Sequence, residues 1–164
     1  MTENDIEVMF SRKSDEWETP KDFFTMLNDK YEFTLDPCAT KENAKCKKFY
    51  TKEDDGLSKS WREETVFVNP PYSDVSNWVR KAFQEAYRGS MGSEVVMLLP
   101  ARTDTKWFHE YCMNAEAIYF VKGRLKFGSE KNSAPFPSMV VLFRKREDDD
   151  FCGGFARIAP MDRK

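Results

Sequence analysis

The sequence predicts an α/β fold in which helices cover both faces of a mostly parallel sheet. Short apolar runs typical of buried strands recur along the chain, and between them apolar residues recur every three or four positions, as on one face of a helix. Strands that alternate with helices in this way are typical of parallel sheets. The length of 164 residues, of which 40% are hydrophobic, suits one domain with its own core.

The first expected element is a helix that begins at Thr19-Pro20. Thr19 suits the N-cap, Pro20 suits the first helical turn, and Asp22 complements the positive end of the helix. We expect a single domain over residues 1–164, with residues 1–15 and 147–164 as loosely ordered tails. The apolar face of the helix comprises Phe23, Phe24, Leu27 and Tyr31.

Apolar runs predict the strands. The run 33–35 ends at Asp36-Pro37, a brief strand is expected near Phe49, and a turn is expected at 54–56. Residues 122–138 contain glycine, proline and lysine and predict a loop or hairpin. The remaining strands are expected at 66–68, 94–99, 117–121 and 139–143.

Two further helices are expected. An amphipathic helix starts after Ser73 or Asp74 and ends at Gly89 and Gly92, and residues 104–113 form another. The first of these two is indicated by the three- and four-residue spacing of Val75, Trp78, Val79, Ala82, Phe83 and Ala86.

Charge and composition exclude several classes of protein. The net charge of −2 argues against a polycation that coats nucleic acid. Cys38, Cys46, Cys112 and Cys152 form no C-x-x-C pair and His109 is the single histidine, so neither a zinc site nor histidine-dependent catalysis is expected. No run resembles a signal peptide or a membrane span. We expect a soluble cytoplasmic protein with reduced thiols and no metal.

The most informative motif is Asn69-Pro70-Pro71-Tyr72, which directly follows the apolar run 65–68. Proline cannot donate to a sheet ladder and restricts the residue before it, so the paired prolines end the strand. The Asn69 side chain and the Pro70 carbonyl then project from the carboxyl end of the strand, where open α/β sheets bind ligands. The alternative is a Pro-Pro turn whose tyrosine fills a crevice.

These groups are suited to holding a planar amine. The lone pair of an exocyclic purine amine is delocalised into the ring, which makes the amine a poor nucleophile. The amide oxygen of Asn69 and the carbonyl of Pro70 can each accept one N–H hydrogen bond, which favours a tetrahedral nitrogen and stabilises the positive charge that develops on it during methyl transfer. Tyr72 offers a face on which a flipped base can stack.

Four motifs occur in a fixed order between about Asp15 and Arg144. They are Asp15-Glu16-Trp17-Glu18-Thr19-Pro20, then Phe33-Thr34-Leu35-Asp36-Pro37-Cys38-Ala39, then Asp55-Gly56-Leu57 before Trp61, and then Phe67-Val68-Asn69-Pro70-Pro71-Tyr72. Over this range the chain resembles the small phage-type DNA N6-adenine methyltransferases, which use S-adenosylmethionine. The resemblance implies a Rossmann-like methyltransferase fold and the transfer of a methyl group to the N6 amine of a flipped adenine, with Asn69, Pro70 and Tyr72 as catalytic residues.

The resemblance also implies a cofactor site. Asp36 accepts from the methionyl ammonium of S-adenosylmethionine, while Asp55 touches the adenine amine of the cofactor. The glycine-rich loop that many such enzymes carry after the first strand is missing here, and ordinary turns at Asp36-Pro37 and Asp55-Gly56 stay open as alternatives. The full set of expected cofactor residues is Trp17, Thr19, Pro20, Asp36, Pro37, Cys38, Asp55, Leu57 and Asn69.

DNA is the implied partner of a protein that we expect to be a monomer. Tyr72 is expected to contact the target base, and basic residues of the 122–137 segment to contact phosphates, with a solvated hairpin as the alternative. The expected phosphate contacts are Lys122, Arg124, Lys126 and Lys131.

Two other classes of function stay open. One is an N-methyltransferase that acts on RNA or on a protein glutamine amide, because the same motif can hold either nitrogen. The other is a nucleic-acid-binding relative without catalytic activity, which failure to bind S-adenosylmethionine would favour.

Overall fold

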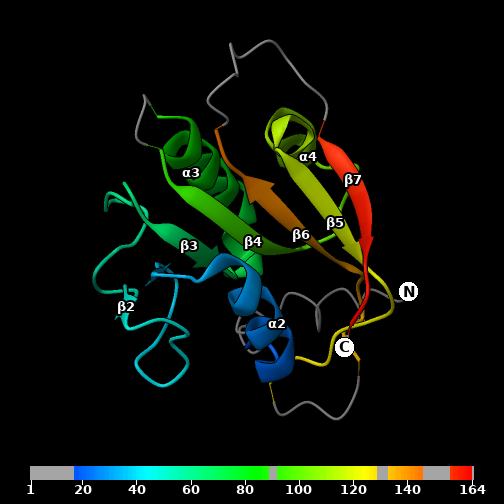
Figure 1. The fold of residues 1–164 in the computed structure, drawn as a ribbon, viewed down its shortest axis with the longest axis horizontal. Coiled ribbons are helices and arrows are strands. Elements are labelled where there is room, and N and C mark those ends of the chain that lie inside the picture. Colours follow the sequence, from blue (N-terminus) through cyan, green and yellow to red (C-terminus); the bar gives the residue numbers. More distant parts are fainter. Residues whose placement is uncertain (1–16, 89–91, 129–132, 146–155, 164) are drawn as a thin grey trace.

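The computed structural model describes residues 17–88, 92–128, 133–145 and 156–163, which form an α/β fold around one seven-stranded sheet (Figure 1). The order of the strands across the sheet is β2-β1-β3-β4-β6-β5-β7. Their bounds are β1 (Leu35–Asp36), β2 (Lys48–Phe49), β3 (Thr65–Val68), β4 (Glu94–Pro100), β5 (Ala117–Val121), β6 (Ser138–Phe143) and β7 (Arg157–Met161).

The sheet is mixed, so the α/β class is confirmed but the expectation of a mostly parallel sheet is corrected. The neighbouring strands β2, β1, β3 and β4 pair in parallel, and β5 pairs in parallel with β7. Strand β6 runs antiparallel to both of its neighbours, β4 and β5. The described residues between β5 and β6 form no helical crossover, and a connection without a crossover returns the chain in the opposite direction.

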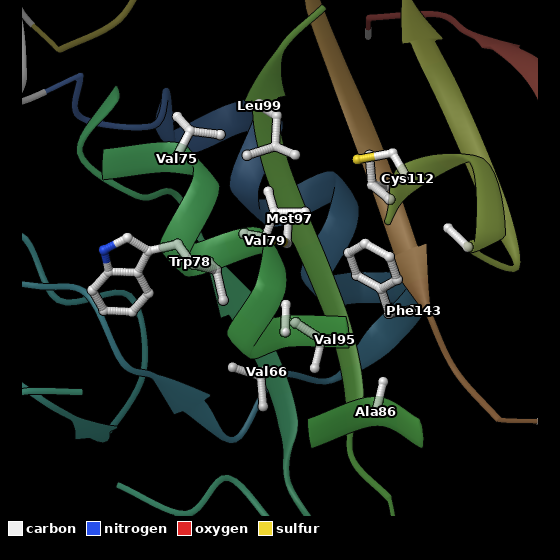
Figure 2. Close-up of a cluster of buried hydrophobic side chains, with 14 of the residues drawn as sticks. Val66, Val75, Trp78, Val79, Ala86, Val95, Met97, Leu99, Cys112 and Phe143 are labelled. Atoms are coloured by element: carbon white, nitrogen blue, oxygen red, sulfur yellow. The ribbon is translucent and has the colours of Figure 1, made fainter. Parts of the chain in front are cut away.

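Helices cover both faces of the sheet. On one face α3 (Val75–Tyr87) and α4 (Lys106–Glu110) pack against side chains that include Val95 and Met97. Figure 2 shows this core, with side chains of α3 beside those of β3, β4 and β6. On the other face α2 (Lys21–Tyr31) packs against side chains that include Val96 and Leu98. Neighbouring residues of β4 therefore face different cores, as the alternation of side chains along a strand requires.

Helix α2 begins without the expected N-cap. Pro20 occupies the N-cap position, and no side chain caps the helix. The hydroxyl of Thr19 is buried and accepts a hydrogen bond from Asn69 instead. The expectation that Thr19 caps the helix is therefore wrong, because a tertiary partner takes its hydroxyl oxygen.

The other two helices differ in how well they match expectation. Helix α3 covers the predicted span and follows the short 3-10 helix η2 (Tyr72–Asp74). The single helix predicted over 104–113 is wrong, since α4 ends at Glu110 and a separate 3-10 helix η3 (Cys112–Asn114) follows it. The side-chain Nδ2 of Asn114 donates to the backbone carbonyl of Glu110 at 3.0 Å. Side-chain bonds of this kind compete with the backbone bonds that would continue the helix.

Residues near the carboxyl terminus form the edge strand β7 rather than part of a tail. Residues 157–161 pair with β5 along its whole length. Ile158 in this strand is 62% exposed, whereas Ala159 and Met161 are partly buried against the core that α2 covers, so β7 is held by backbone pairing with β5 and by these two side chains. The expected tail of residues 147–164 is thus corrected for its last described part. Residues 1–15 and 147–155 lie outside the described residues.

The described cysteines are free thiols, and the single histidine is exposed. Cys38, Cys46 and Cys112 carry free thiols, whereas Cys152 lies outside the described residues. The ring of His109 contacts the carbonyl of Thr103 at 2.8 Å, just before α4. Within the described part of the chain, no helix is both long enough and apolar enough to cross a membrane.

Candidate active site

The predicted site residues gather at the carboxyl ends of β1 and β3. These strands are parallel neighbours, with Leu35 paired to Val66, so both chains leave the sheet at the same edge. Asp36 ends β1, and Asn69 directly follows β3. Pro70 behind it is buried. Ligands bind at this edge in open α/β sheets.

The side chain of Asn69 is held through its amide nitrogen, which leaves its amide oxygen able to accept a hydrogen bond. Its Nδ2 atom donates to the carbonyl oxygen of Trp17, and also to Thr19 Oγ1 at 3.0 Å. A carbonyl oxygen can only accept, so the nitrogen of the amide must face Trp17. Oδ1 of Asn69 is buried and has no hydrogen-bond partner among the residues that the structure describes. A buried acceptor without a partner costs about 1–3 kcal/mol, and such an atom in a folded protein calls for a functional explanation.

Tyr72 belongs to a cluster of four aromatic rings beside Asn69. Its ring lies 6.5 Å from that of Trp17 at an interplanar angle of 26°, and 5.3 Å from that of Phe136 at 68°. Its hydroxyl is buried without a partner, and burial raises the pKa of Tyr72 well above its usual range. Tyr72 is therefore a neutral donor. Phe127 completes the cluster through contacts with Trp17 and Phe136.

Asp36 is a buried carboxylate with spare acceptor capacity. It is 4% exposed, and its two oxygens accept from the backbone amides of Cys38 at 3.3 Å and Lys45 at 3.0 Å. Each carboxylate oxygen can accept a second hydrogen bond. Burial raises the pKa of Asp36 to about 6, and the two amide bonds oppose this rise only in part. A cation placed beside Asp36 would restore the ionised form.

Residues 17–20 form a short segment beside Asn69, which we call the strap. The carbonyl of Glu18 accepts from the amide of Gly128 at 2.8 Å, and its carboxylate pairs with Lys45 Nζ at 3.2 Å. Together with the bonds from Asn69, these contacts join the strap to the loops that follow β1, β3 and β5. The motif around Trp17 and the motif around Asn69 therefore form one site.

The turn at 54–57 lies against the loop after β1. Gly56 is buried, and a Cβ atom on it would lie 2.0 Å from the carbonyl oxygen of Pro37, so only glycine allows this approach. Asp55 is exposed, with φ of 53°, and Leu57 is half-buried. The structure thus brings the Asp55 motif beside Pro37, as a shared cofactor site requires.

Two of the predicted DNA contacts, Lys122 and Lys126, line a different hollow. Lys122, Arg124 and Lys126 are exposed, while Lys131 lies outside the described residues. A cavity of about 600 Å³ lies between α2 and the segment after β5. It is lined by Pro20, Asp22, Phe23, Met26, Lys122, Gly123, Leu125, Lys126, Asp162 and Arg163.

Sequence reasoning missed three residues at this edge. Phe127 and Phe136 lie in a segment that the sequence predicts to be a loop. The structure buries both, at 2% and 7% exposure. Ser138 at the start of β6 pairs with Pro100 at the end of β4, and its buried hydroxyl has no partner. No sequence signal distinguishes Ser138 from an ordinary strand serine. Among the described residues, no group of His, Cys, Asp and Glu could hold a metal ion.

Comparisons with known proteins identify the family of this chain. The family model described as DNA N-6-adenine-methyltransferase (Dam) matches residues 8–154. A protein of Haemophilus phage HP1 named DNA N-6-adenine-methyltransferase is 34% identical over 146 residues, which cover 83% of each chain. A protein of the same name from Escherichia phage T1 is 35% identical over 113 residues, which cover 68% of this chain but 46% of that relative.

A shorter match points the same way. The putative methyltransferase YfdM of Escherichia coli K12 is 38% identical over 65 residues, which cover 35% of this chain and 71% of that protein. The family model covers most of the chain, and within its span the Asn69 motif, the Asp36 loop and the strap of residues 17–20 meet at one sheet edge. The chain therefore belongs to the DNA N-6-adenine-methyltransferase (Dam) family.

Proposed function

We propose that this protein transfers a methyl group from S-adenosylmethionine to the N6 amine of adenine in DNA, at the carboxyl edge of β1 and β3. Family membership supports the reaction, and one observation supports the place. The Oδ1 atom of Asn69 is buried and unpartnered while Nδ2 of the same side chain is held by Trp17 and Thr19. The acceptor is thus fixed in orientation before a substrate arrives, as electrostatic catalysis requires.

The residues beside Asn69 fit S-adenosylmethionine. The spare acceptor capacity of the Asp36 carboxylate suits a methionyl ammonium, and Thr19 Oγ1, which already accepts from Asn69, keeps its proton to donate to a carboxylate. Pro20, Pro37, Cys38 and Trp17 border these groups, and Asp55 and Leu57 take the adenine end. When bound, S-adenosylmethionine supplies an electrophilic methyl group. We also propose a Rossmann-like methyltransferase fold for the mixed sheet, since its ligand edge is the one that this fold uses.

The chain's own groups then orient the target amine. Asn69 Oδ1 and the Pro70 carbonyl accept its two protons, which opposes delocalisation of the nitrogen lone pair into the ring. Tyr72 supplies a face for the flipped base, and access to that face requires the cluster with Trp17 and Phe136 to open. After transfer the positively charged nitrogen is acidic enough to lose a proton without a strong general base.

DNA phosphates contact the basic residues beside the cavity. Lys122 and Lys126 line it together with Arg163, and Arg124 and Lys131 belong to the same segment. We expect Lys126→Ala to weaken DNA binding at all sequences and to lower the salt dependence of binding by about one ion. Lys30→Ala, at the opposite end of α2, is the matched control. Equal affinities for both variants would remove Lys126 from the interface.

The decisive experiment is tritium transfer from labelled S-adenosylmethionine to unmethylated duplex DNA, followed by digestion and chromatography of the nucleosides. Label in N6-methyldeoxyadenosine is the expected result. Cofactor binding without label in DNA would favour RNA or a protein glutamine as the substrate. Absence of cofactor binding would favour an inactive binding protein. A monomer in the cytoplasm is the expected working form.

A further inference from the structure

The turn that carries Asp55 and Leu57 is shaped by short-range hydrogen bonds, among them Asp55 N to Lys52 O at 3.3 Å and Ser58 N to Asp55 O at 2.9 Å. Asp55 adopts a left-handed conformation, and β2 before the turn is two residues long. The turn keeps its shape through these bonds, but its distance from the loop after β1 depends on contacts made outside it. Its near side rests on Pro37, through the close approach at Gly56.

Trp61 holds the other side of this turn. Its indole Nε1 donates to the carbonyl oxygen of Gly56 at 2.9 Å. Trp61 is fully buried, at 0% exposure, so this bond forms away from water and sets the position of the peptide between Gly56 and Leu57. The residue that would contact the cofactor is therefore joined directly to the peptide that Trp61 fixes.

Trp61 is in turn held by α3 and by the residue before β4. The carboxylate of Glu85 accepts from the backbone amide of Trp61 at 2.9 Å, and the hydroxyl of Ser93 donates to its carbonyl. The ring of Trp78 stacks on that of Trp61, with centroids 6.1 Å apart and an interplanar angle of 20°. Lys81 Nζ lies 5.5 Å from the centroid of the Trp61 ring and pairs with Glu85 at 2.6 Å.

Glu85 is the most informative member of this network. It is 3% exposed, and a buried carboxylate loses several kcal/mol of hydration that its partners must offset. A hydrophobic residue would fill this position at lower cost if packing were the only requirement. The carboxylate instead accepts from the backbone amide of Trp61, the residue that holds the turn at 54–57.

We propose that Trp61, held by Glu85, is a positioning residue for the cofactor: it sets the distance between the Asp55–Leu57 turn and the Asp36–Pro37 loop. This inference rests on the proposed function, because it assumes that the turn takes the adenine end of S-adenosylmethionine. It assigns to Trp61 and Glu85 an effect on cofactor affinity and none on DNA binding or on the Asn69 site.

Trp61→Phe tests the proposal because it removes the indole donor and keeps an aromatic ring. We expect the KM and the calorimetric Kd for S-adenosylmethionine to rise about five- to tenfold, as the loss of one buried hydrogen bond implies. We expect kcat at saturating cofactor and the Kd for DNA to stay within about twofold of wild type. Trp107→Phe makes the same change in α4, outside this network, and should leave all four quantities unchanged.

Two results would overturn the proposal. One is unchanged cofactor affinity in a folded Trp61→Phe protein, and the other is an equal loss of affinity in Trp61→Phe and Trp107→Phe. If Trp61→Phe does not fold, Gly56→Ala tests the spacing between the turn and the Asp36–Pro37 loop, because the added Cβ would lie 2.0 Å from the Pro37 carbonyl oxygen and would push the two apart. It should raise the KM for cofactor with kcat retained, and an unchanged KM would then refute the proposal. A wild-type protein that binds no S-adenosylmethionine would remove the proposed function and this inference together, a result separate from any variant.

Discussion

The two parts of the sheet are built in opposite ways. On one side, β1 and β2 are two residues long and β3 is four; the buried Asp36 ends β1, and Asn69, whose amide oxygen has no partner among the described residues, follows β3. On the other side, β4 and β6 pair over six positions, and all six residues of β6 are buried. The long ladder is held by backbone hydrogen bonds along six residue pairs, whereas the loops after the short strands carry the candidate site. Stability and activity should therefore respond to different substitutions.

Asn69→Ala should give the largest effect and should act mainly on activity. Loss of a fixed acceptor at the reacting amine is expected to lower kcat by about 10²–10³-fold. Stability should fall by about 1 kcal/mol, because Thr19 and Trp17 each lose a donor. Labelled methyl transfer and thermal unfolding measure the two effects. Asn77→Ala removes an exposed asparagine from α3 and serves as the control; wild-type activity of Asn69→Ala would refute the assigned site.

Leu142→Ala should show the opposite behaviour. Leu142 is 2% exposed in the middle of β6, and deletion of such a side chain costs about 2–5 kcal/mol of unfolding free energy. The KM for S-adenosylmethionine should stay within about twofold at a temperature where the variant is folded. Urea unfolding and steady-state kinetics test this pair of expectations. A large change in KM without loss of stability would contradict the division between the two parts of the sheet.

The pH dependence of cofactor binding tests the role of Asp36 on the side of the sheet that carries the candidate site. Because burial raises the pKa of Asp36 to about 6, the carboxyl must lose a proton before it can accept from an ammonium. Affinity for S-adenosylmethionine should therefore be constant above pH 6 and fall about tenfold for each pH unit below it. Calorimetry between pH 5 and 8 measures this slope. Asp36→Asn should bind weakly at every pH, and a wild-type profile as flat as that of the variant would argue against contact with the ammonium.

Asp36 should also make the stability of the cofactor-free protein depend on pH, and this stability should fall as the pH rises, whereas cofactor affinity rises. The folded pKa of Asp36 is higher than the value of about 3.9 for an unfolded chain, so the folded state binds the proton more tightly. The stability contributed by this proton is full below pH 4 and is lost as the pH rises through 6. As the pH is raised from 3.5 to 7, the unfolding free energy of wild type should therefore fall relative to that of Asp36→Asn.

Arg144→Met should give the smallest effect. Arg144 joins Glu94 at 2.9 Å and Glu116 at 2.7 Å, at the ends of β4, β5 and β6 away from the site. The Arg144 side chain is 44% exposed but that of Glu116 is 4% exposed, so the variant takes a charged partner away from a buried carboxylate, and the loss should be about 1–3 kcal/mol and reduced only in part by 1 M salt. Activity should not change. A salt-independent loss would show that the packing of Arg144, and not its charge, is what stabilises this edge.

Prediction from the sequence worked where the signal is local. The spacing of apolar residues in 75–86 reproduces α3, and the runs 94–99 and 117–121 reproduce β4 and β5 to within one residue. Proline after Asn69 ends β3 at the expected residue. Each of these features depends on residues within one turn of helix or a few positions of strand, so the surrounding fold changes it little.

Prediction failed where a partner far along the chain decides the outcome. Thr19 has the right chemistry for an N-cap, yet its hydroxyl oxygen is taken by Asn69, fifty positions away. Strand β7 carries an exposed Ile158 and a proline, and only the open edge of β5 makes it a strand. Phe136 reads as part of a loop, and packing against Trp17 and Tyr72 places it in the site.

The sequence by itself determined the α/β class, the end of β3 at the Asn69 motif and the turns beside it, because turn residues, strand ends and helix periodicity are local properties of the chain. Only the tertiary structure decided the reversed direction of β6, which amide atom of Asn69 is left without a partner, and which residues hold the Asp55 turn in place. These depend on which surfaces meet, and a hydrogen bond or a close contact between distant segments leaves no periodic signal in either of them.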